Sequence, residues 1–338
     1  MTVPAASDGT ATAPAAGIAE LGAEAARART SYGEGALIAC DRLVRIYTAE
    51  GIEVQALQGL DLLICEGELT AVVGASGSGK STLMNILAGL DTPTAGSVRV
   101  AGHDLATMSA RDRLRYRRDT VGFVWQQTSR NLLPYLTAAQ NVMMPMRFSG
   151  TSRRHRATRA RELLDVLTVG HCAGRTPEQM SGGEQQRTAI ATALANGPRL
   201  LLADEPTGEL DSATAREVFG ALQASNAELG VTILVVTHDP AVSGQVRRTI
   251  AIRDGRTSSE TLRHAEPDGL GGASEHAVEY AVLDRMGRVQ LPRDMTEPLS
   301  MRDRVRLEAT ADHIGVWPDA PAGPADAGHR PAAGQQDP

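Results

Sequence analysis

The chain has 338 residues, of which 42% are hydrophobic, 22% charged and 3% aromatic, and its formal net charge is −6. This length predicts a large domain with a smaller one, with cores built mainly from aliphatic side chains. The acidic balance argues against a protein that grips nucleic acid phosphates over its whole surface. The three cysteines, Cys40, Cys65 and Cys172, lack a zinc-binding spacing, so we expect reduced thiols. No run of about 18 apolar residues occurs, and the Ala-rich start lacks a signal-peptide pattern, which predicts an intracellular location.

Composition divides the chain into five segments. The small and polar residues of 1–35 predict a disordered tail, and the Pro, Ala and Gly residues of 319–338 predict another. Between them we expect a main domain at 36–257, a Ser-, Glu- and Gly-rich linker at 258–276 and a small β-rich module at 277–318. Within that module the pattern predicts a hairpin over 280–292 around Gly287, a short helix at 295–301, and a strand, turn and strand over 304–317.

The main domain alternates strand and helix patterns. Short β-type runs occupy 37–40, 43–47 and 59–64, and the apolar run 69–73 leads into a glycine-rich loop and a helical pattern at 82–88. The runs 200–203 and 231–236 are apolar without alternation, which is typical of central parallel strands. Together these runs predict an α/β fold of the nucleotide-binding type.

An Arg-rich helical stretch covers 153–166, between the first and second of the central strands. Its charges favour a solvated helix face over a binding surface.

Residues 74–81 read Gly-Ala-Ser-Gly-Ser-Gly-Lys-Ser, the P-loop pattern, placed after a strand and before a helix. Glycines let successive N–H groups face an anion, and the helix N-terminus adds partial positive charge. Lys80, the single lysine among 34 basic residues, would reach the β and γ phosphates, and the Ser81 hydroxyl would ligate Mg²⁺. We therefore expect ATP to contact Gly74, Ala75, Ser76, Gly77, Ser78, Gly79, Lys80, Ser81 and Thr82.

Two adjacent acids end the apolar run 200–203. Asp204 is placed to hold Mg²⁺, and Glu205 is placed to act as the base toward an attacking water. Two acids at a strand end are also compatible with the simple start of a loop, but the P-loop elsewhere in the domain favours a hydrolytic site.

Residues 180–187 read Met-Ser-Gly-Gly-Glu-Gln-Gln-Arg and precede a clear helical pattern at 188–194. Ser181, Gly182 and Gly183 therefore form a second helix N-terminus suited to an anion. One nucleotide cannot use two such sites far apart in one subunit, whereas a head-to-tail dimer brings each to the other's γ-phosphate.

This motif resembles the signature of the ABC transporter ATPases, which is usually Leu-Ser-Gly-Gly-Gln, and departs from it at Met180 and Glu184. The resemblance covers roughly 37–256. It implies a P-loop NTPase with an α-helical signature subdomain that binds ATP and Mg²⁺, pairs as a homodimer and works on a transmembrane permease at the cytoplasmic face of the membrane.

The resemblance also implies roles for single residues. Tyr47 matches an aromatic that stacks on adenine, although a packed or edge-strand tyrosine is the alternative. Gln126 matches a glutamine that contacts Mg²⁺ and the water, Asp211 a loop that crosses the dimer interface, and His238 a histidine that contacts the γ-phosphate. The segments 89–96, 123–126 and 202–208 look like the branch that includes lipoprotein-release, macrolide-export and cell-division ATPases.

Residues 280–292 and 304–307 resemble the swapped-hairpin modules of AbrB-type regulators, which dimerise and bind DNA. Because the chain is acidic, we favour a regulatory or dimer-strengthening appendage, with nucleic acid as the less favoured partner. Two other functions remain as alternatives: a soluble ABC ATPase of the DNA-repair or translation-factor kind, and an ATP-sensing regulator whose C-terminal module binds DNA. A single P-loop, no long heptad pattern and no zinc cysteines argue against the first.

Overall fold

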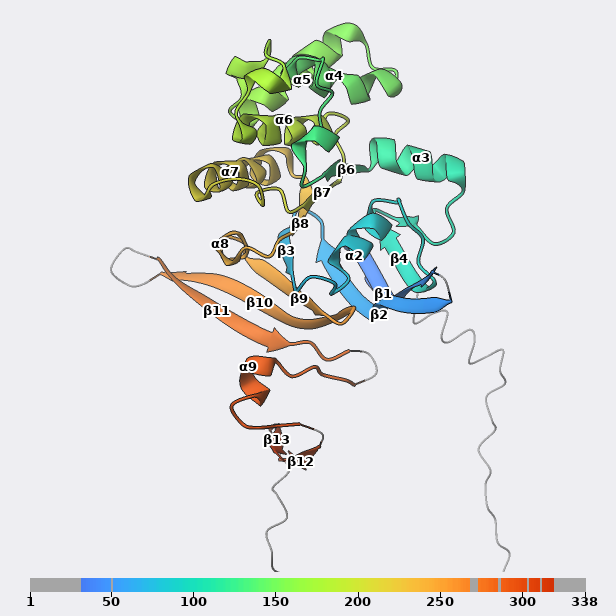
Figure 1. The fold of residues 1–338 in the computed structure, drawn as a ribbon, viewed down its shortest axis with the longest axis vertical. Coiled ribbons are helices and arrows are strands. Elements are labelled where there is room, and N and C mark those ends of the chain that lie inside the picture. Colours follow the sequence, from blue (N-terminus) through green and yellow to red (C-terminus); the bar gives the residue numbers. More distant parts are fainter. Residues whose placement is uncertain are drawn as a thin grey trace, which may run out of the picture.

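The computed structural model describes residues 32–49, 51–267, 273–284, 287–302, 304–310 and 312–318. The tails predicted at both ends therefore lie largely outside the described residues, and only 32–35 of the first are seen, as a turn. Within the described part, the chain forms a central sheet covered on both faces, with a helical lobe at one end and a small C-terminal module at the other (Figure 1).

The central sheet has seven strands in the order β11-β10-β9-β3-β8-β7-β6. Neighbours from β9 to β6 are parallel, as predicted for the apolar runs, whereas β10 and β11 are antiparallel additions. The strands are β3 (Leu69–Val73), β6 (Val121–Val124), β7 (Leu200–Asp204), β8 (Thr232–Val236), β9 (Arg248–Arg253), β10 (Arg256–Pro267) and β11 (Ala273–Ala281).

A second, antiparallel sheet has the order β2-β1-β4-β5. Its strand β1 unites two of the predicted runs, because a register shift with Arg42 at φ 49° interrupts the side-chain alternation without ending the strand. The bounds are β1 (Ala36–Ala49), β2 (Ile52–Cys65), β4 (Ala95–Val100) and β5 (His103–Asp104).

Five of the described helices, α3 to α7, begin at a side-chain cap. Ser109, Thr137, Ser152, Ser181 and Asp211 each accept a backbone N–H in the first turn that follows them. The described helices are α2 (Lys80–Leu87), α3 (Ala110–Asp119), α4 (Ala138–Phe148), α5 (Arg153–Val166), α6 (Gly182–Leu194), α7 (Ser212–Leu229), α8 (Pro240–Ser243) and α9 (Arg293–Thr296), with 3-10 turns η1 (Thr128–Arg130), η2 (Gly170–Cys172) and η3 (Pro177–Gln179).

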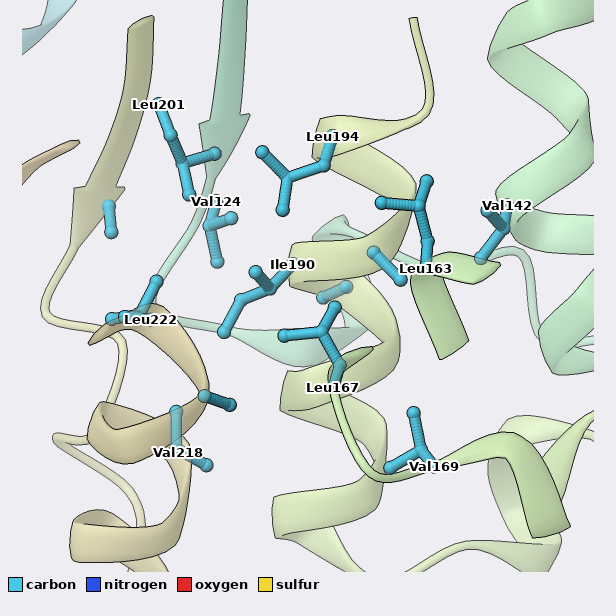
Figure 2. Close-up of a cluster of buried hydrophobic side chains, with 14 of the residues drawn as sticks. Val124, Val142, Leu163, Leu167, Val169, Ile190, Leu194, Leu201, Val218 and Leu222 are labelled. Carbon is cyan, nitrogen blue, oxygen red and sulfur yellow. The ribbon is translucent and has the colours of Figure 1, made fainter. Parts of the chain in front are cut away.

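Two buried clusters hold these layers together. One joins the central sheet to α4–α7, and Figure 2 shows Ile190 of α6 between Val124 on the sheet side and Leu163 of α5. The other packs α2 and the opposite face of the sheet against β1, β2 and β4. The shared sheet therefore fixes the start of α2 relative to the ends of β7 and β8.

The prediction of a linker at 258–276 is wrong for the residues described there, because they form strands. Strand β10 runs through 267 and β11 begins at 273, pairing in register from Ser259 with Ala281 to Pro267 with Ala273. Main-chain pairing does not need apolar side chains, and the buried hydroxyls find partners: Ser258 Oγ donates to Ala251 O at 3.2 Å and Ser259 Oγ to Glu279 Oε1 at 2.6 Å.

Strand β11 places residues 277–281 in the central sheet, so the predicted start of the C-terminal module at 277 is wrong, but the elements after β11 follow the predicted order. A bridge joins Leu283 to Val289, with Gly287 in the turn between them, and β12 (Val305–Ala309) pairs with β13 (Ile314–Pro318). Helix α9 is shorter and begins earlier than predicted, at Arg293. Across the described residues, no helix combines the length and apolar character needed to cross a membrane.

Candidate nucleotide site

The P-loop and the ends of β7 and β8 enclose a cavity of about 690 Å³, a volume typical of small-molecule sites. Eleven predicted site residues line this cavity: Gly74, Ala75, Ser76, Gly77, Gly79, Lys80, Ser81, Thr82, Asp204, Glu205 and His238. The fold thus brings three separate sequence motifs to one place at the carboxyl edge of the parallel strands.

Gly79 ends the loop and precedes α2. Its φ is 104°, and a Cβ there would lie 2.5 Å from the Ala56 carbonyl oxygen, so only glycine fits. The first turn of α2 consequently opens onto the cavity with its N–H groups unused by a side-chain cap.

Lys80 is buried, and its Nζ donates to the carbonyl oxygens of Gly74 and Ala75 at 2.7 and 2.8 Å. These two bonds hold the ammonium at the loop, on the wall of the cavity. A compact group with freely oriented donors can keep such bonds while it faces a phosphate.

Ser78, by contrast, does not line the cavity. Its Oγ is buried and has no hydrogen-bond partner among the described residues, and its N–H donates to Ala75 O. The predicted contact of Ser78 with ATP therefore has no direct geometric support.

Asp204 and Ser81 line the same cavity, and both carry side-chain oxygen atoms. Burial, and then the neighbouring Glu205 carboxylate, raise the pKa of Asp204, while Lys80 opposes that rise. A half-buried carboxylate whose charge is disfavoured, beside a hydroxyl, is a donor set that fits a hard divalent cation such as Mg²⁺.

Glu205 and His238 meet across the ends of β7 and β8. His238 Nδ1 lies 3.0 Å from Glu205 Oε1. Glu205 has the left-handed φ of 45°, and its backbone is held there by Glu205 N–H donating to Val236 O and by Gly208 N–H donating to Glu205 O. Such a conformation in a non-glycine residue costs on the order of 1 kcal/mol and persists only where neighbours impose it.

Gln126 follows β6 and is exposed. A Cβ built on Gly208 would lie 3.2 Å from Gln126 Nε2 and 3.3 Å from Glu205 Oε2, so both side chains converge on the loop after β7. Asn131 holds the Gln126 segment by bonding both the N–H and the carbonyl oxygen of Trp125. Gln126 does not itself line the cavity.

The signature motif starts α6, which lies in the helical lobe apart from α2 (Figure 1). Ser181 Oγ accepts the Glu184 N–H, and Ser181 N–H donates to Glu184 Oε2 at 2.7 Å, which is a reciprocal capping box. That backbone bond, followed by the His171 contact, lowers the pKa of Glu184 to about 2. Ser181, Gly182 and Gly183 do not line the cavity of their own chain.

The close packing of α6 against α7 requires a glycine at position 183 of the signature. A Cβ there would lie 2.4 Å from Thr214 Cγ2, so the first turn of α6 packs closely on α7. At the start of α7, the Asp211 carboxylate accepts bonds from Ala213 N–H, Thr214 N–H and Thr214 Oγ, and the Thr214 bonds lower its pKa. Asp211 is thus a helix cap, and it lies beside the signature rather than in the cavity.

Tyr47 does not line the cavity, although its strand partner Val54 does. Its OH donates to Asp91 Oδ2 at 2.7 Å, and the Arg45 guanidinium lies 4.4 Å from its ring centroid. Tyr47 pairs with Val54, and the wall residues that the sequence analysis missed are Val54, Gln55, Ala56 and Val236. Because Tyr47 was predicted to contact adenine, the strand paired with it, which carries Val54, Gln55 and Ala56, could have been predicted to lie at the same site.

The comparisons agree with this architecture. Residues 57–208 match the family model described as ABC transporter. The chain is 47% identical over 219 residues to the lipoprotein-releasing system ATP-binding protein LolD 2 of Caulobacter vibrioides, covering 65% of this chain and 95% of that protein. This chain belongs to the ABC transporter family.

Some relatives are longer, and this chain covers only part of their length. The macrolide export ATP-binding/permease protein MacB of Rhodospirillum rubrum is 47% identical over 66% of this chain, which spans about a third (34%) of that protein. Among solved structures, the dimeric ATP-binding cassette MJ0796, in a post-hydrolysis state bound to ADP and Pi, superposes with a TM-score of 0.60 and 40% identity, covering 66% of this chain and 97% of the cassette.

Proposed function

We propose that the protein is the ATP-hydrolysing subunit of a membrane transporter, and that it acts as a homodimer. The observation that carries the proposal is the convergence of Lys80, Ser81, Asp204, Glu205 and His238 on one cavity while the signature at Ser181 stays outside it. A phosphate cradle with a metal-type donor pair and a carboxylate base fits nucleoside triphosphate hydrolysis.

Each residue has a distinct task in this scheme. The loop N–H groups and Lys80 bind the phosphates, and Ser81 with Asp204 would hold Mg²⁺, which supplies charge compensation for the phosphates. Glu205 accepts a proton from the attacking water, and His238 orients that carboxylate. The side chains of Gln126 and Glu205 converge on Gly208. Gln126 would therefore respond to whether the site holds ATP and transmit this change to the helical lobe.

The dimer follows from two half-sites in one chain. Ser181 and its glycines present a helix N-terminus that no group of the same cavity uses, so the γ-phosphate is enclosed when a second copy offers its signature. The dimeric state of the cassette MJ0796 supports this arrangement.

Mixing Lys80→Ala with Ser181→Ala tests the composite site. Random pairing makes half of the dimers mixed, and each mixed dimer keeps one of two sites, so we expect up to about a quarter of the wild-type rate. Each variant alone should be nearly inactive. A mixture no faster than its components, although mixed dimers form, would contradict the shared site.

The membrane partner would dock on a groove beside α4. A cavity of about 410 Å³ lies between α3, β6, α4 and α6, with Phe123, Met144 and Phe148 among its lining residues. Phe148 and the loop residue Tyr135, which precedes α4, are 71% and 72% exposed, unusual for side chains of this size. This groove adjoins the segment that carries Gln126, which gives a short route from nucleotide to partner.

The similarity to a lipoprotein-releasing and a macrolide export protein supports a permease of the lipoprotein-release or macrolide-export branch. Detergent-solubilised membranes from cells expressing tagged protein should yield a co-purifying permease, and Phe148→Asp should abolish its recovery while ATP binding persists. Recovery of nucleic acid without a membrane protein would instead favour the soluble or DNA-binding alternative.

The C-terminal module would strengthen the dimer. The sheet β12-β13 has only two strands, and every residue of β12 is exposed, including Val305 and Leu307. A lone hairpin of this kind is marginal in water, which favours its pairing with the same module of a second copy. The swapped-hairpin resemblance of this segment is part of the same proposal.

A further inference from the structure

The turn between β9 and β10, residues 253–256, packs against the P-loop. Gly255 N–H donates to Ser78 O at 3.0 Å, and Gln58 N–H, from β2, donates to Gly255 O at 2.9 Å. Gly255 has a φ of 69°, and a Cβ there would lie 2.7 Å from the Ala56 carbonyl oxygen, so only glycine fits this close approach. The turn is therefore fixed between the P-loop and β2.

Two cavities border the P-loop. Loop residues 74–77 line the nucleotide cavity, and they also line a second cavity of about 260 Å³ together with Ile252, Arg253 and Asp254. A segment bordered by open space is held by few contacts, so each of them matters for its conformation. The bond between the β9–β10 turn and Ser78 O is one of these contacts.

The C-terminal module contacts the same turn through its hairpin segment, residues 282–284 and 287–292. Three contacts join the two: Gln290 Nε2 donates to Asp254 Oδ2 at 3.3 Å, Arg253 Nη1 donates to Leu291 O at 3.4 Å, and Arg256 Nη1 lies 3.9 Å from Asp284 Oδ2. The hairpin segment thus bears on three of the four residues of the turn that supports the P-loop.

We propose that the C-terminal module sets the nucleotide affinity of its own chain, because the hairpin segment restrains the β9–β10 turn and the turn restrains the P-loop. A loop already held in its binding conformation loses less freedom when the ligand binds, so this restraint raises affinity. By linkage, a bound nucleotide stabilises the contact between the hairpin segment and the turn by the same factor. This inference rests on the nucleotide site proposed above.

The rival explanation is that the module acts on nucleotide binding only through the dimer. ADP separates the two, because it lacks the γ-phosphate that the signature of a second copy would enclose. Equilibrium binding of ADP at pH 8 therefore measures the effect within one chain. Thermal melting of each variant shows whether it is folded.

A charge change at the contact is the first test. Gln290→Glu brings a second carboxylate to Asp254, and their repulsion should separate the hairpin segment from the turn and weaken ADP binding about two- to fivefold. Asp254→Asn keeps an acceptor oxygen for Gln290, so it should bind ADP as the wild type does. In the double variant Asp254→Asn/Gln290→Glu an amide can again donate to an oxygen, and affinity should return to the wild-type value.

Arg306→Ala is the matched control for this test. Arg306 is an exposed residue of β12, in the same module, and its loss changes the net charge by the same amount as Gln290→Glu. It should leave ADP affinity unchanged. A loss equal to that of Gln290→Glu would show a general effect of charge and would overturn the inference.

Chain length provides the second test. A chain ending at Ala281 lacks the hairpin segment and should bind ADP roughly three- to tenfold more weakly than the full chain. Arg253→Ala should weaken ADP binding about two- to fivefold in the full chain, where it removes the bond to Leu291 O, and should cause no further loss in the chain ending at Ala281.

Hydrogen exchange checks the reciprocal effect. Saturating ADP should slow exchange of peptides covering 287–292 in the wild type by a factor similar to the affinity lost on truncation, and should slow it less in Gln290→Glu. Exchange that ADP leaves unchanged in the wild type would contradict the coupling.

The inference is overturned if Gln290→Glu binds ADP as the wild type does, if Asp254→Asn fails to rescue it, or if Arg253→Ala costs the same affinity in both chain lengths. These failures differ from failure of the proposed function. A folded wild-type chain that does not bind ADP would show that the nucleotide site is wrong. A wild type that binds ADP, with truncated and substituted chains that bind it equally well, would remove only the role of the module.

Discussion

His238 Nδ1 lies 3.0 Å from Glu205 Oε1, although the two residues are 33 positions apart in the chain. The parallel pairing of β7 with β8, which aligns Asp204 with Val236, brings them together at the edge of the sheet. His238 is 67% exposed at its side chain, so it reaches Glu205 from the open mouth of the cavity.

His238→Ala should therefore slow hydrolysis while nucleotide binding stays near wild type. Loss of a group that orients the base and faces the γ-phosphate should cost roughly tenfold to hundredfold in kcat. Steady-state ATPase assays with His155→Ala as a control check this. A His238→Ala protein with unchanged kcat would remove His238 from the site.

Lys80→Arg should weaken nucleotide binding or turnover although the charge is kept. Nζ fits between two carbonyl oxygens at 2.7 and 2.8 Å in a buried position, and the larger planar guanidinium cannot keep both bonds. Equilibrium binding of a fluorescent ATP analogue should show a loss of about tenfold or more. Equal affinity and equal rate would contradict the argument.

Asp204→Asn should stabilise the nucleotide-free protein at neutral pH and abolish hydrolysis. Burial and Glu205 raise the pKa of Asp204, so the ionised form disfavours the folded state. This penalty appears as pH rises through the ordinary range of an aspartate and on through the raised folded pKa, and it disappears in acid, where the carboxyl is protonated. Calorimetry should show a melting temperature roughly 2–4 °C higher than wild type at pH 7.5, with the gain shrinking toward pH 4.

Two truncations should separate the sheet from the C-terminal module. A chain ending at Ala281 keeps β11 and should melt near the wild-type temperature, whereas a chain ending at Pro267 loses β11 and its pairing along β10. The shorter chain also leaves the buried Ser259 hydroxyl without Glu279, so it should melt lower. Both should bind ATP, since every predicted contact precedes or includes His238. Equal melting of the two would show that β11 adds no stability.

Features that reside in continuous segments of the chain could be predicted from the sequence. Binding a phosphate needs a local loop and the first turn of a helix, so a candidate phosphate loop at Gly74–Ser81 could be predicted without knowing the rest of the fold, and all of its residues except Ser78 line the cavity. Asp204 and Glu205 were found for the same reason, since an apolar strand that ends in two acids is a local pattern.

The features that the sequence did not predict depend on how distant segments pair and pack. The side chains of β10 predict a linker, whereas backbone pairing, which does not depend on side chains, supplies most of the hydrogen bonds of this strand. The His171 contact to Glu184 depends on how η2 packs against α6, which no periodicity reveals. The wall residues 54–56 enter the cavity only through the register of β2 with β1.

The shared nucleotide site is the central claim, and it is tested most directly by sedimentation of Glu205→Gln and Ser181→Ala/Glu205→Gln with and without ATP and Mg²⁺. Blocking the base should trap ATP, so ATP should tighten association of the Glu205→Gln chain at least about tenfold, and the added Ser181→Ala change should remove that effect. The account is contradicted if ATP leaves association of Glu205→Gln unchanged while the wild-type protein hydrolyses ATP at a rate per chain that does not depend on protein concentration.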